Sequence, residues 1–183
     1  RVVSRGKELR RLHDAITDYA RRLFSSELTL DETRRLEALI IVTVNLDHVA
    51  ETIAVNMVSL GRERLERRFA ISGETAGRFQ PYASGVREAY LLALKALDSK
   101  DTEAAAAVIE MKADIDRMSE EIVEHLSARL LSDDPDRAVL YRVESRLVEL
   151  IQRIYYFSHM IAGEILKESE ARKGDGEAYR KAS

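Results

Sequence analysis

The sequence predicts an all-α protein, an antiparallel helical bundle of about five long helices with an internal duplication. Three observations support this fold class. Only 8 Gly and 2 Pro occur among 183 residues, so turns are few and the elements between them are long. Apolar residues, 45% of the chain, recur every three or four positions over long stretches, which is the spacing of one helix face. Charged residues make up 33%, enough to cover the outer faces of such helices.

Composition also argues against several function classes. The chain has no Cys, which excludes disulfides, thiolate metal sites and cysteine nucleophiles. Its 29 basic and 32 acidic residues give a net charge of −3, so we expect no nucleic-acid partner. The longest uninterrupted apolar stretch, 38–44, is far shorter than the roughly 20 residues of a membrane span. We therefore expect no helix of this chain to cross a bilayer.

The first two predicted helices form a hairpin. The first has an apolar stripe formed by Leu9, Leu12, Ile16, Tyr19 and Leu23. Asp31 is a candidate N-cap for the second helix, and Gly61 is a candidate stop. The stripe of the second helix is Leu36, Leu39, Thr43, Leu46, Ala50, Ile53, Met57 and Leu60. Further apolar residues widen this stripe, which predicts packing against at least two neighbours: Ile40, Val42, Val49 and Ala54.

The remaining helices follow a less regular middle. Between residues 61 and 86 we expect a helix end, a loop and a restart, with a helix continuing to about Leu97. Asp101 or Thr102 begins the next helix, and the segment 132–135 is a break before the last one. Two stripes define these helices: Val108, Met111, Ile115, Met118, Ile122, Leu126 and Leu130, then Leu140, Val143, Leu147, Leu150, Ile154, Phe157 and Ile161.

The helical hairpins at the two ends of the chain resemble each other. An offset of 106 residues places Leu12 on Met118 and Asp14 on Glu120, while offsets of 104 to 111 fit the second helices. The sequence thus predicts one domain over residues 1–170, with repeats at about 3–62 and 74–170 and a flexible polar tail at 171–183. If each unit has three helices, the first lacks its leading helix. The apolar flank Ile40, Val42, Val49 and Ala54 would then have too little cover. Either the leading helix belongs to a longer protein of which this chain is a piece, or another subunit supplies it, and we expect a homodimer.

No catalytic constellation is recognisable. A di-iron site of the ferritin type needs Glu three residues before His on two helices, but Arg10, Asn45, Ile122 and Tyr156 precede the four histidines. No glycine spacing suits a phosphate loop, and no Ser or Lys lies in a nucleophile motif. The sequence therefore predicts a protein that is not an enzyme.

Two sets of charged residues are candidate binding sites. Carboxylates one helical turn apart, at Asp14 and Asp18 and at Asp47 and Glu51, could offer oxygen ligands to a metal ion, although solvated helix faces produce the same spacing. A second set could contact an anionic partner or a membrane surface, or form a solvated helix end: Arg62, Arg64, Arg67 and Arg68.

The stretch 45–57, NLDHVAETIAVNM, resembles the helix signature of PhoU-type domains, in which an acidic pair follows Asn and precedes a small-residue stretch. Residues 115–130 resemble a helix of the later repeat, and the resemblance extends over about 7–168. More specifically, the chain resembles the PhoU-like cytoplasmic region at the C-terminus of bacterial sodium/phosphate cotransporter-family membrane proteins. The resemblance implies a two-repeat, six-helix bundle and a metal cluster of Fe, Mn, Zn or Ni. It places Asp47 and Glu51 at the motif carboxylates, and Asp14 and Asp18 among the supporting acidic groups.

In the second repeat this acidic motif is degenerate, because Ile154/Ser158 or Tyr155/His159 take the places of the pair. The family implies phosphate uptake and its control. We thus expect a non-enzymatic regulatory domain of a sodium-dependent phosphate transporter, on the cytoplasmic side of the inner membrane. Its partner would be its own transmembrane domain or a separate phosphate transporter. Two alternatives remain: a stand-alone PhoU-like phosphate-signalling regulator, and a structural helical dimer without metal.

Overall fold

The described part of the chain is entirely helical. The computed structural model describes the backbone of residues 1–68, 70–130 and 137–182, and side chains as far as residue 171. The elements are α1 (Val2–Phe24), α2 (Leu30–Glu51), the π-helix η1 (Thr52–Met57), α3 (Val58–Glu66), α4 (Gly73–Ser99), α5 (Thr102–Glu110), α6 (Lys112–Arg129) and α7 (Arg137–Ala182). Since α2, η1 and α3 are continuous and α5 meets α6 at Met111, these elements form five rods, which confirms the predicted all-α bundle.

The helix ends follow local chemistry, with two corrections to the predictions. Thr29, not Asp31, is the N-cap of α2. The two residues form a capping box, in which the Thr29 side chain accepts a hydrogen bond from the backbone N–H of Glu32 and the Glu32 side chain accepts one from that of Thr29. Gly61 does not end the second helix, which continues to Glu66. Asp101 caps α5 as expected, by accepting hydrogen bonds from the backbone of Glu103 and Ala104.

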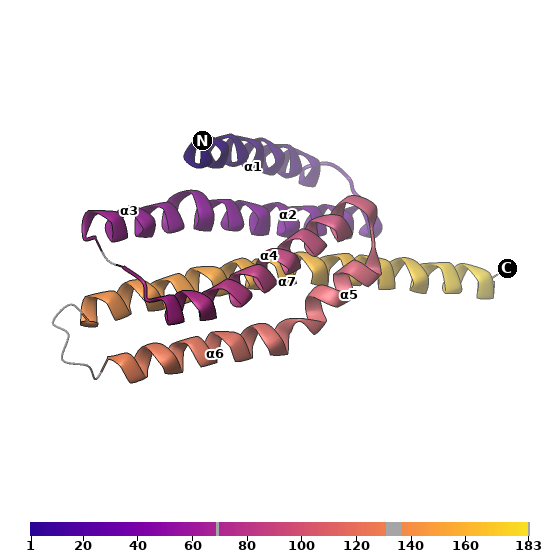
Figure 1. The fold of residues 1–183 in the computed structure, drawn as a ribbon. Helices are drawn as coiled ribbons and strands as arrows, with labels where there is room; N and C mark the ends of the chain where they lie inside the picture. Colours follow the sequence, from indigo (N-terminus) through magenta and orange to yellow (C-terminus); the bar gives the residue numbers. More distant parts are fainter. Residues whose placement is uncertain (69, 131–136, 183) are drawn as a thin grey trace.

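The bundle is built around α7 (Figure 1). This helix packs against α2, α4, α5 and α6, whereas α1 lies at the edge and packs on α2 and η1. The main apolar core therefore belongs to α4–α7, with α2 as its further wall. The backbone of α7 stays helical through Ala182, past the start of the predicted tail at 171. The predicted break at 132–135 lies outside the described residues.

Burial confirms most of the later apolar stripes but corrects the first, and it also corrects Leu39 and Leu130, which are 47% and 41% exposed. Val108, Ile115, Ile122 and Leu126 are buried, and so are five residues of the α7 stripe: Leu140, Val143, Leu150, Ile154 and Ile161. In α1, by contrast, Leu9, Leu12 and Tyr19 are exposed. The flank predicted to lack cover is in fact covered, because Val42, Val49 and Ala54 are buried and Ile40 is half-buried. Uncovered apolar surface therefore lies on α1, and not where the sequence placed it.

One stretch of the described chain also meets the length and composition of a membrane span. It is the continuous rod Leu30–Glu66, whose most apolar window has a mean hydropathy of 1.6. The length of uninterrupted apolar stretches is therefore too strict a criterion for excluding a membrane span. Polar residues such as Thr43 and Asn45 interrupt this helical rod, but its mean hydropathy stays high. In the bundle 44% of that window is buried against other helices, as in a core helix.

The close approach of α1 to η1 depends on Gly6. A Cβ at this position would lie 2.5 Å from the Cβ of Ala54, a contact that only a backbone shift could relieve. We expect Gly6→Val to lower the free energy of unfolding by about 1–3 kcal/mol, because the helices must separate. Urea denaturation followed by circular dichroism measures this. The matched control is Gly61→Val, since a Cβ at Gly61 meets nothing within 4 Å; equal losses would contradict the close contact.

Candidate functional site

The acidic motif of α2 faces a single arginine of α1. Arg10 places Nε 3.2 Å from Oδ1 of Asp47 and Nη2 3.6 Å from Oε2 of Glu51. The side chain of Asp47 is only 8% exposed, whereas Glu51 is 42% exposed at the rim. One guanidinium thus contacts both carboxylates from the neighbouring helix and offsets their mutual repulsion.

The polar residues around this motif are satisfied within their own helix. The Asn45 side-chain amide donates to the Ile41 carbonyl oxygen at 2.7 Å, and the Thr52 hydroxyl donates to that of His48 at 2.8 Å. The ring of His48 stacks on Phe157 of α7, with centroids 4.9 Å apart. The motif therefore directs its carboxylates toward α1 and its histidine toward α7.

The other two predicted acidic ligands lie apart from this pair. Asp14 is 65% exposed and lies 3.3 Å from Nδ1 of His13, while Asp18 is 63% exposed and accepts a hydrogen bond from Arg21 at 2.8 Å. These contacts are typical of a solvated helix face. The structure therefore brings Asp47 and Glu51 together but does not gather all four carboxylates.

The donor set here does not fit a metal cluster. Among the described residues, no group of three or more His, Asp or Glu side chains is placed to hold a metal ion. The space beside Asp47 and Glu51 is occupied by the Arg10 guanidinium, which carries the charge that a cation would supply. A metal bound to these carboxylates stays a prediction from the family resemblance.

We expect Arg10→Gln to lower the free energy of unfolding by about 1–3 kcal/mol, because it leaves the nearly buried carboxylate of Asp47 without its cation. Thermal melting at neutral pH measures the loss. Arg5→Gln is the matched control on the same helix, because Arg5 pairs with Glu8 in an exposed ion pair worth about 0–1 kcal/mol. If both variants melt alike, the pairing of Arg10 with the motif is unimportant for stability.

A polar chain in the second repeat connects α4, α7 and α6. The Tyr82 hydroxyl donates to Oε1 of Gln152 at 2.6 Å, and Nε2 of Gln152 donates to Oδ1 of Asp116 at 2.8 Å. Asp116 also pairs with Lys112, and these contacts lower the pKa of Asp116, with Lys112 the largest cause. Burial, followed by the charge of Lys112, lowers the pKa of nearby His159, although Asp116 acts in the opposite direction.

One alignment of the two repeats matches the contact between Asp116 and Gln152 with that between Arg10 and Asp47, since Asp116 is Arg10 plus 106 and Gln152 is Asp47 plus 105. In this alignment the counterparts of the acidic pair are Gln152 and Tyr156. The second repeat thus keeps a polar contact at this level but carries its carboxylate on α6.

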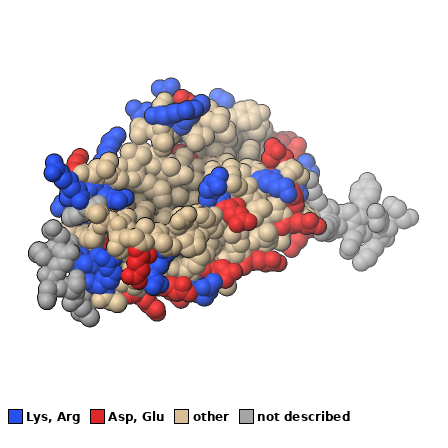
Figure 2. Space-filling view, viewed as in Figure 1, with Lys and Arg blue, Asp and Glu red and all other residues tan. Residues whose placement is uncertain are grey.

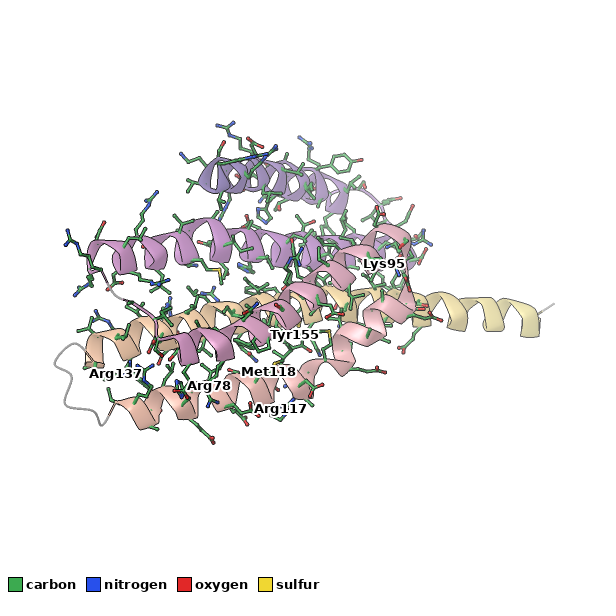
Figure 3. All side chains as sticks on the ribbon, in the orientation of Figure 1. Arg78, Lys95, Arg117, Met118, Arg137 and Tyr155 are labelled. Carbon is green, nitrogen blue, oxygen red and sulfur yellow. The ribbon has the colours of Figure 1, made fainter. Side chains whose placement is uncertain are left out.

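Two buried tyrosines lie beside these hydrogen-bonded side chains, and they make the stability of the fold depend on pH in the alkaline range. Burial raises the pKa of Tyr82 and of Tyr155 from 10 to about 12, and the nearby charge of Asp116 adds to both shifts. The Tyr155 hydroxyl donates to the Val108 carbonyl at 2.9 Å between α7 and α5–α6 (Figure 3).

Because the folded state holds these protons more tightly than the unfolded state, the stabilisation is complete below pH 10. It is lost as pH rises from 10 towards 12. We expect the urea midpoint to fall between pH 10 and 12, and to fall less steeply in Tyr82→Phe. An equal fall in both proteins would contradict a role for Tyr82.

The predicted basic residues lie at one end of the bundle, where α3 terminates. Arg62, Arg64, Arg67 and Arg68 are all exposed, and Arg67 pairs with Glu63, 3.4 Å away. Glu63 also contacts Arg142 of α7 at 3.4 Å. In Figure 2, Lys and Arg atoms gather at this end of the molecule, while Asp and Glu atoms are more frequent at the opposite end. The four arginines thus form part of a basic end, hereafter the α3 cluster.

Sequence reasoning missed three residues that the structure brings into these sites: Arg10, Gln152 and Tyr82. In the sequence, Arg10 is notable only because it stands three residues before His13, where a di-iron site would need Glu. No sequence signal selected Arg10, because Asp14 stands four residues later on the same helix and offers an ordinary acidic partner. Gln152 and Tyr82 carry no charge, and no spacing rule selects them.

Comparison with known proteins finds a PhoU domain in part of the chain and a PhoU-like fold. Residues 82–161 match the model of the PhoU domain, a range that extends from α4 to α7 and contains the polar chain described above. The fold matches the crystal structure of PhoU from Pseudomonas aeruginosa with a TM-score of 0.74 at 15% identity, over 92% of this chain and 83% of that one. No curated protein matches the sequence. The predicted resemblance to PhoU is therefore confirmed for a PhoU domain at residues 82–161 and for the PhoU-like helical fold.

Proposed function

We propose that this chain is a non-enzymatic regulator of phosphate uptake and phosphate signalling that acts on the cytoplasmic side of the inner membrane. The PhoU domain match over residues 82–161 is the observation that supports this function, and the matched fold of PhoU supports it over nearly the whole chain. A regulator of this kind works by contact, and the described residues contain large exposed faces, including the α3 cluster.

A stand-alone regulator fits these observations better than a domain attached to a sodium-dependent transporter. The fold match is to PhoU, and it extends over most of both chains. The attached form remains the second candidate, because the α2 motif resembles the cytoplasmic region of sodium/phosphate cotransporters. In that form the partner would be the transmembrane domain of the same protein.

Deletion of the coding region in the source organism distinguishes the two. For a stand-alone regulator we expect phosphate-starvation promoters to respond wrongly to high external phosphate, while the sodium dependence of phosphate uptake is unchanged. Promoter reporters and labelled phosphate uptake, with and without sodium, measure both. Loss of a sodium-dependent component of uptake with normal promoter control would instead establish the attached form.

We also propose that the α3 cluster is the surface that contacts an acidic region of the regulated protein. Its arginines are exposed and lie at the end of a rod anchored in the core, so their charge is presented without unfolding any part of the bundle. A variant with Gln at Arg62, Arg64, Arg67 and Arg68 should fold normally but fail to restore promoter control in the deletion strain. Full restoration would exclude this surface.

A further inference from the structure

Helix α3 lies beside α7 but does not close against it. It is the last part of the rod that begins with α2, and none of its residues is buried. Figure 1 shows it next to the beginning of α7. An ion pair connects the two helices, with Oε1 of Glu63 3.4 Å from Nη2 of Arg142. Because these two side chains are 37% and 65% exposed, the contact lies at the surface and leaves the space between the helices accessible.

This space is a groove, hereafter the α3–α7 groove. Its volume is about 420 Å³. Leu60 and Glu63 line it from α3, and its lining on α7 includes Arg142, Val143 and Arg146. The groove thus places apolar side chains between charged ones. An amphipathic helix bound in a groove needs this combination, because its apolar face and its charged edges are contacted together.

The charges around the α3–α7 groove favour an acidic occupant. Arginines outnumber glutamates by six to three among the residues that reach the surface on α3, at its C-terminal end and on the groove side of α7: Arg62, Arg64, Arg67, Arg68, Arg142 and Arg146 against Glu63, Glu66 and Glu149. The resulting net charge of +3 lies at the basic end seen in Figure 2. Such a surface attracts and orients a partner of opposite charge.

Two glutamates of the chain show how this groove holds a carboxylate. Oε1 of Glu63 lies 3.4 Å both from Nε of Arg67 and from Nη2 of Arg142. Oε2 of Glu149 lies 2.9 Å from Nη1 of Arg146. All five side chains are at least 37% exposed, so these ion pairs are weak and can be exchanged for others at little cost. A carboxylate from a partner can therefore take the place of Glu63 between its two arginines.

We propose that the α3–α7 groove binds an acidic amphipathic helix of the regulated protein. Carboxylates of this helix pair with Arg142 and Arg146 in place of Glu63 and Glu149, and its apolar face contacts Leu60. The inference rests on the proposed contact between the α3 cluster and an acidic region of that protein, and it names the shape and chemistry of the region. An anionic bilayer is a poorer match, because a flat surface reaches the tips of the α3 cluster but not the inside of a groove.

A synthetic peptide tests the shape of the occupant. The labelled probe carries Glu along one helical face and Leu along the other, and its control has the same composition in an order that leaves no continuous apolar face. Fluorescence anisotropy should show that the full chain binds the probe about tenfold more tightly than the control. Equal affinities would mean that charge alone attracts the peptide, which would overturn the proposal.

Substitutions of single charges test the contacts inside the groove. We expect Arg142→Gln and Arg146→Gln each to weaken binding of the probe by about three- to tenfold. Glu63→Gln should tighten it by about threefold, because the internal competitor is removed. Arg78→Gln and Glu74→Gln are the matched controls, since they make the same charge changes in an exposed pair on α4 that does not line the groove. Effects of equal size in the controls, or no gain in Glu63→Gln, would overturn the proposal.

Leu65 separates a protein helix from a membrane. It is 77% exposed among the arginines of the α3 cluster, but it does not line the α3–α7 groove. We expect Leu65→Ser to leave binding of the probe unchanged. Co-sedimentation with phosphatidylglycerol vesicles measures the alternative. A chain that binds these vesicles, loses them in Leu65→Ser and does not bind the probe would overturn the proposal in favour of a lipid surface.

The deletion strain distinguishes this inference from the proposed function. The double variant Arg142→Gln/Arg146→Gln should fail to restore promoter control where the parental chain restores it. Restoration by the double variant would overturn the inference and leave the regulatory function intact. A parental chain that binds the probe as expected but restores nothing would contradict the function, while the peptide measurements would still support the groove.

Discussion

Replacing Glu144 with alanine should lower the free energy of unfolding by about 3–5 kcal/mol, one of the two largest losses we expect from a single side chain. Glu144 is fully buried, and Arg137 of the same helix is only 3% exposed. Their closest atoms, Nη2 and Oε2, are 3.0 Å apart, across two turns of α7. Among the described residues, removing the carboxylate leaves the buried guanidinium without a counter-charge, and Nε and Nη1 of Arg137 already lack hydrogen-bond partners there.

The matched control is Glu149→Ala, also on α7. Glu149 pairs with Arg146 at 2.9 Å, but both side chains are at least half exposed, so the loss should be about 0–1 kcal/mol. Replacing both buried partners, with Met at 137 and Leu at 144, should recover most of the stability that Glu144→Ala removes. Urea denaturation measures all three variants. A loss in Glu144→Ala no larger than in the control would show that the buried charge is accommodated by other means.

Truncation of Tyr82 to alanine should cost about 3–5 kcal/mol, because it opens a cavity at the centre of the second repeat. Tyr82 has no exposed surface and belongs to the main core cluster. Its hydroxyl also anchors the chain through Gln152 to Asp116, so the packing of α4 on α7 and the polar contact with α6 depend on one side chain.

Two further variants separate packing from hydrogen bonding at this position. Tyr82→Phe keeps the ring and should cost only about 0.5–1.5 kcal/mol. Tyr156→Ala removes a tyrosine that is 56% exposed and should have a small effect on unfolding. Chemical denaturation at pH 7 compares them. A loss in Tyr82→Ala close to that of Tyr156→Ala would mean that the core closes around the missing ring.

The long helices could be predicted from the sequence because each one buries most of its apolar stripe. Ile115, Ile122 and Leu126 on α6 and Leu150 and Ile161 on α7 are at least 98% buried, as their three- and four-residue spacing indicates. The same spacing on α1 correctly indicated a helix, but half of its stripe is exposed. Periodicity reports how wide an apolar face is, whereas the number of neighbours available to cover it depends on the rest of the fold.

The helix boundaries that were predicted wrongly have local explanations. Thr29 and Glu32 form the sequence pattern of a capping box, which is a stronger start signal than Asp31 alone. Gly61 costs an interior helix position only about 1 kcal/mol, which the tertiary packing of the rod outweighs. No pattern indicated the π-helix at Thr52–Met57, where the rod adjusts beside the close contact with Gly6.

The candidate site could be predicted only in part. The turn-apart spacing of Asp47 and Glu51 identified the acidic pair, and the PhoU-type motif predicted the helical fold that the structure has. Its neutraliser, Arg10, could not be chosen among the arginines of the chain, because the stagger between α1 and α2 decides which side chain reaches Asp47. The same unknown stagger left the counterpart of Asp47 open until the contact between Gln152 and Asp116 was seen.

Expression of this 183-residue chain alone in the deletion strain tests the proposed function most directly. The readout is the activity of a phosphate-starvation promoter in cells grown with high phosphate. We expect the chain to restore the parental response. The Tyr82→Ala variant, which should unfold more readily, should restore it less well. A chain that accumulates to parental levels in its folded form but leaves the promoter response unchanged would contradict a stand-alone PhoU-like regulator.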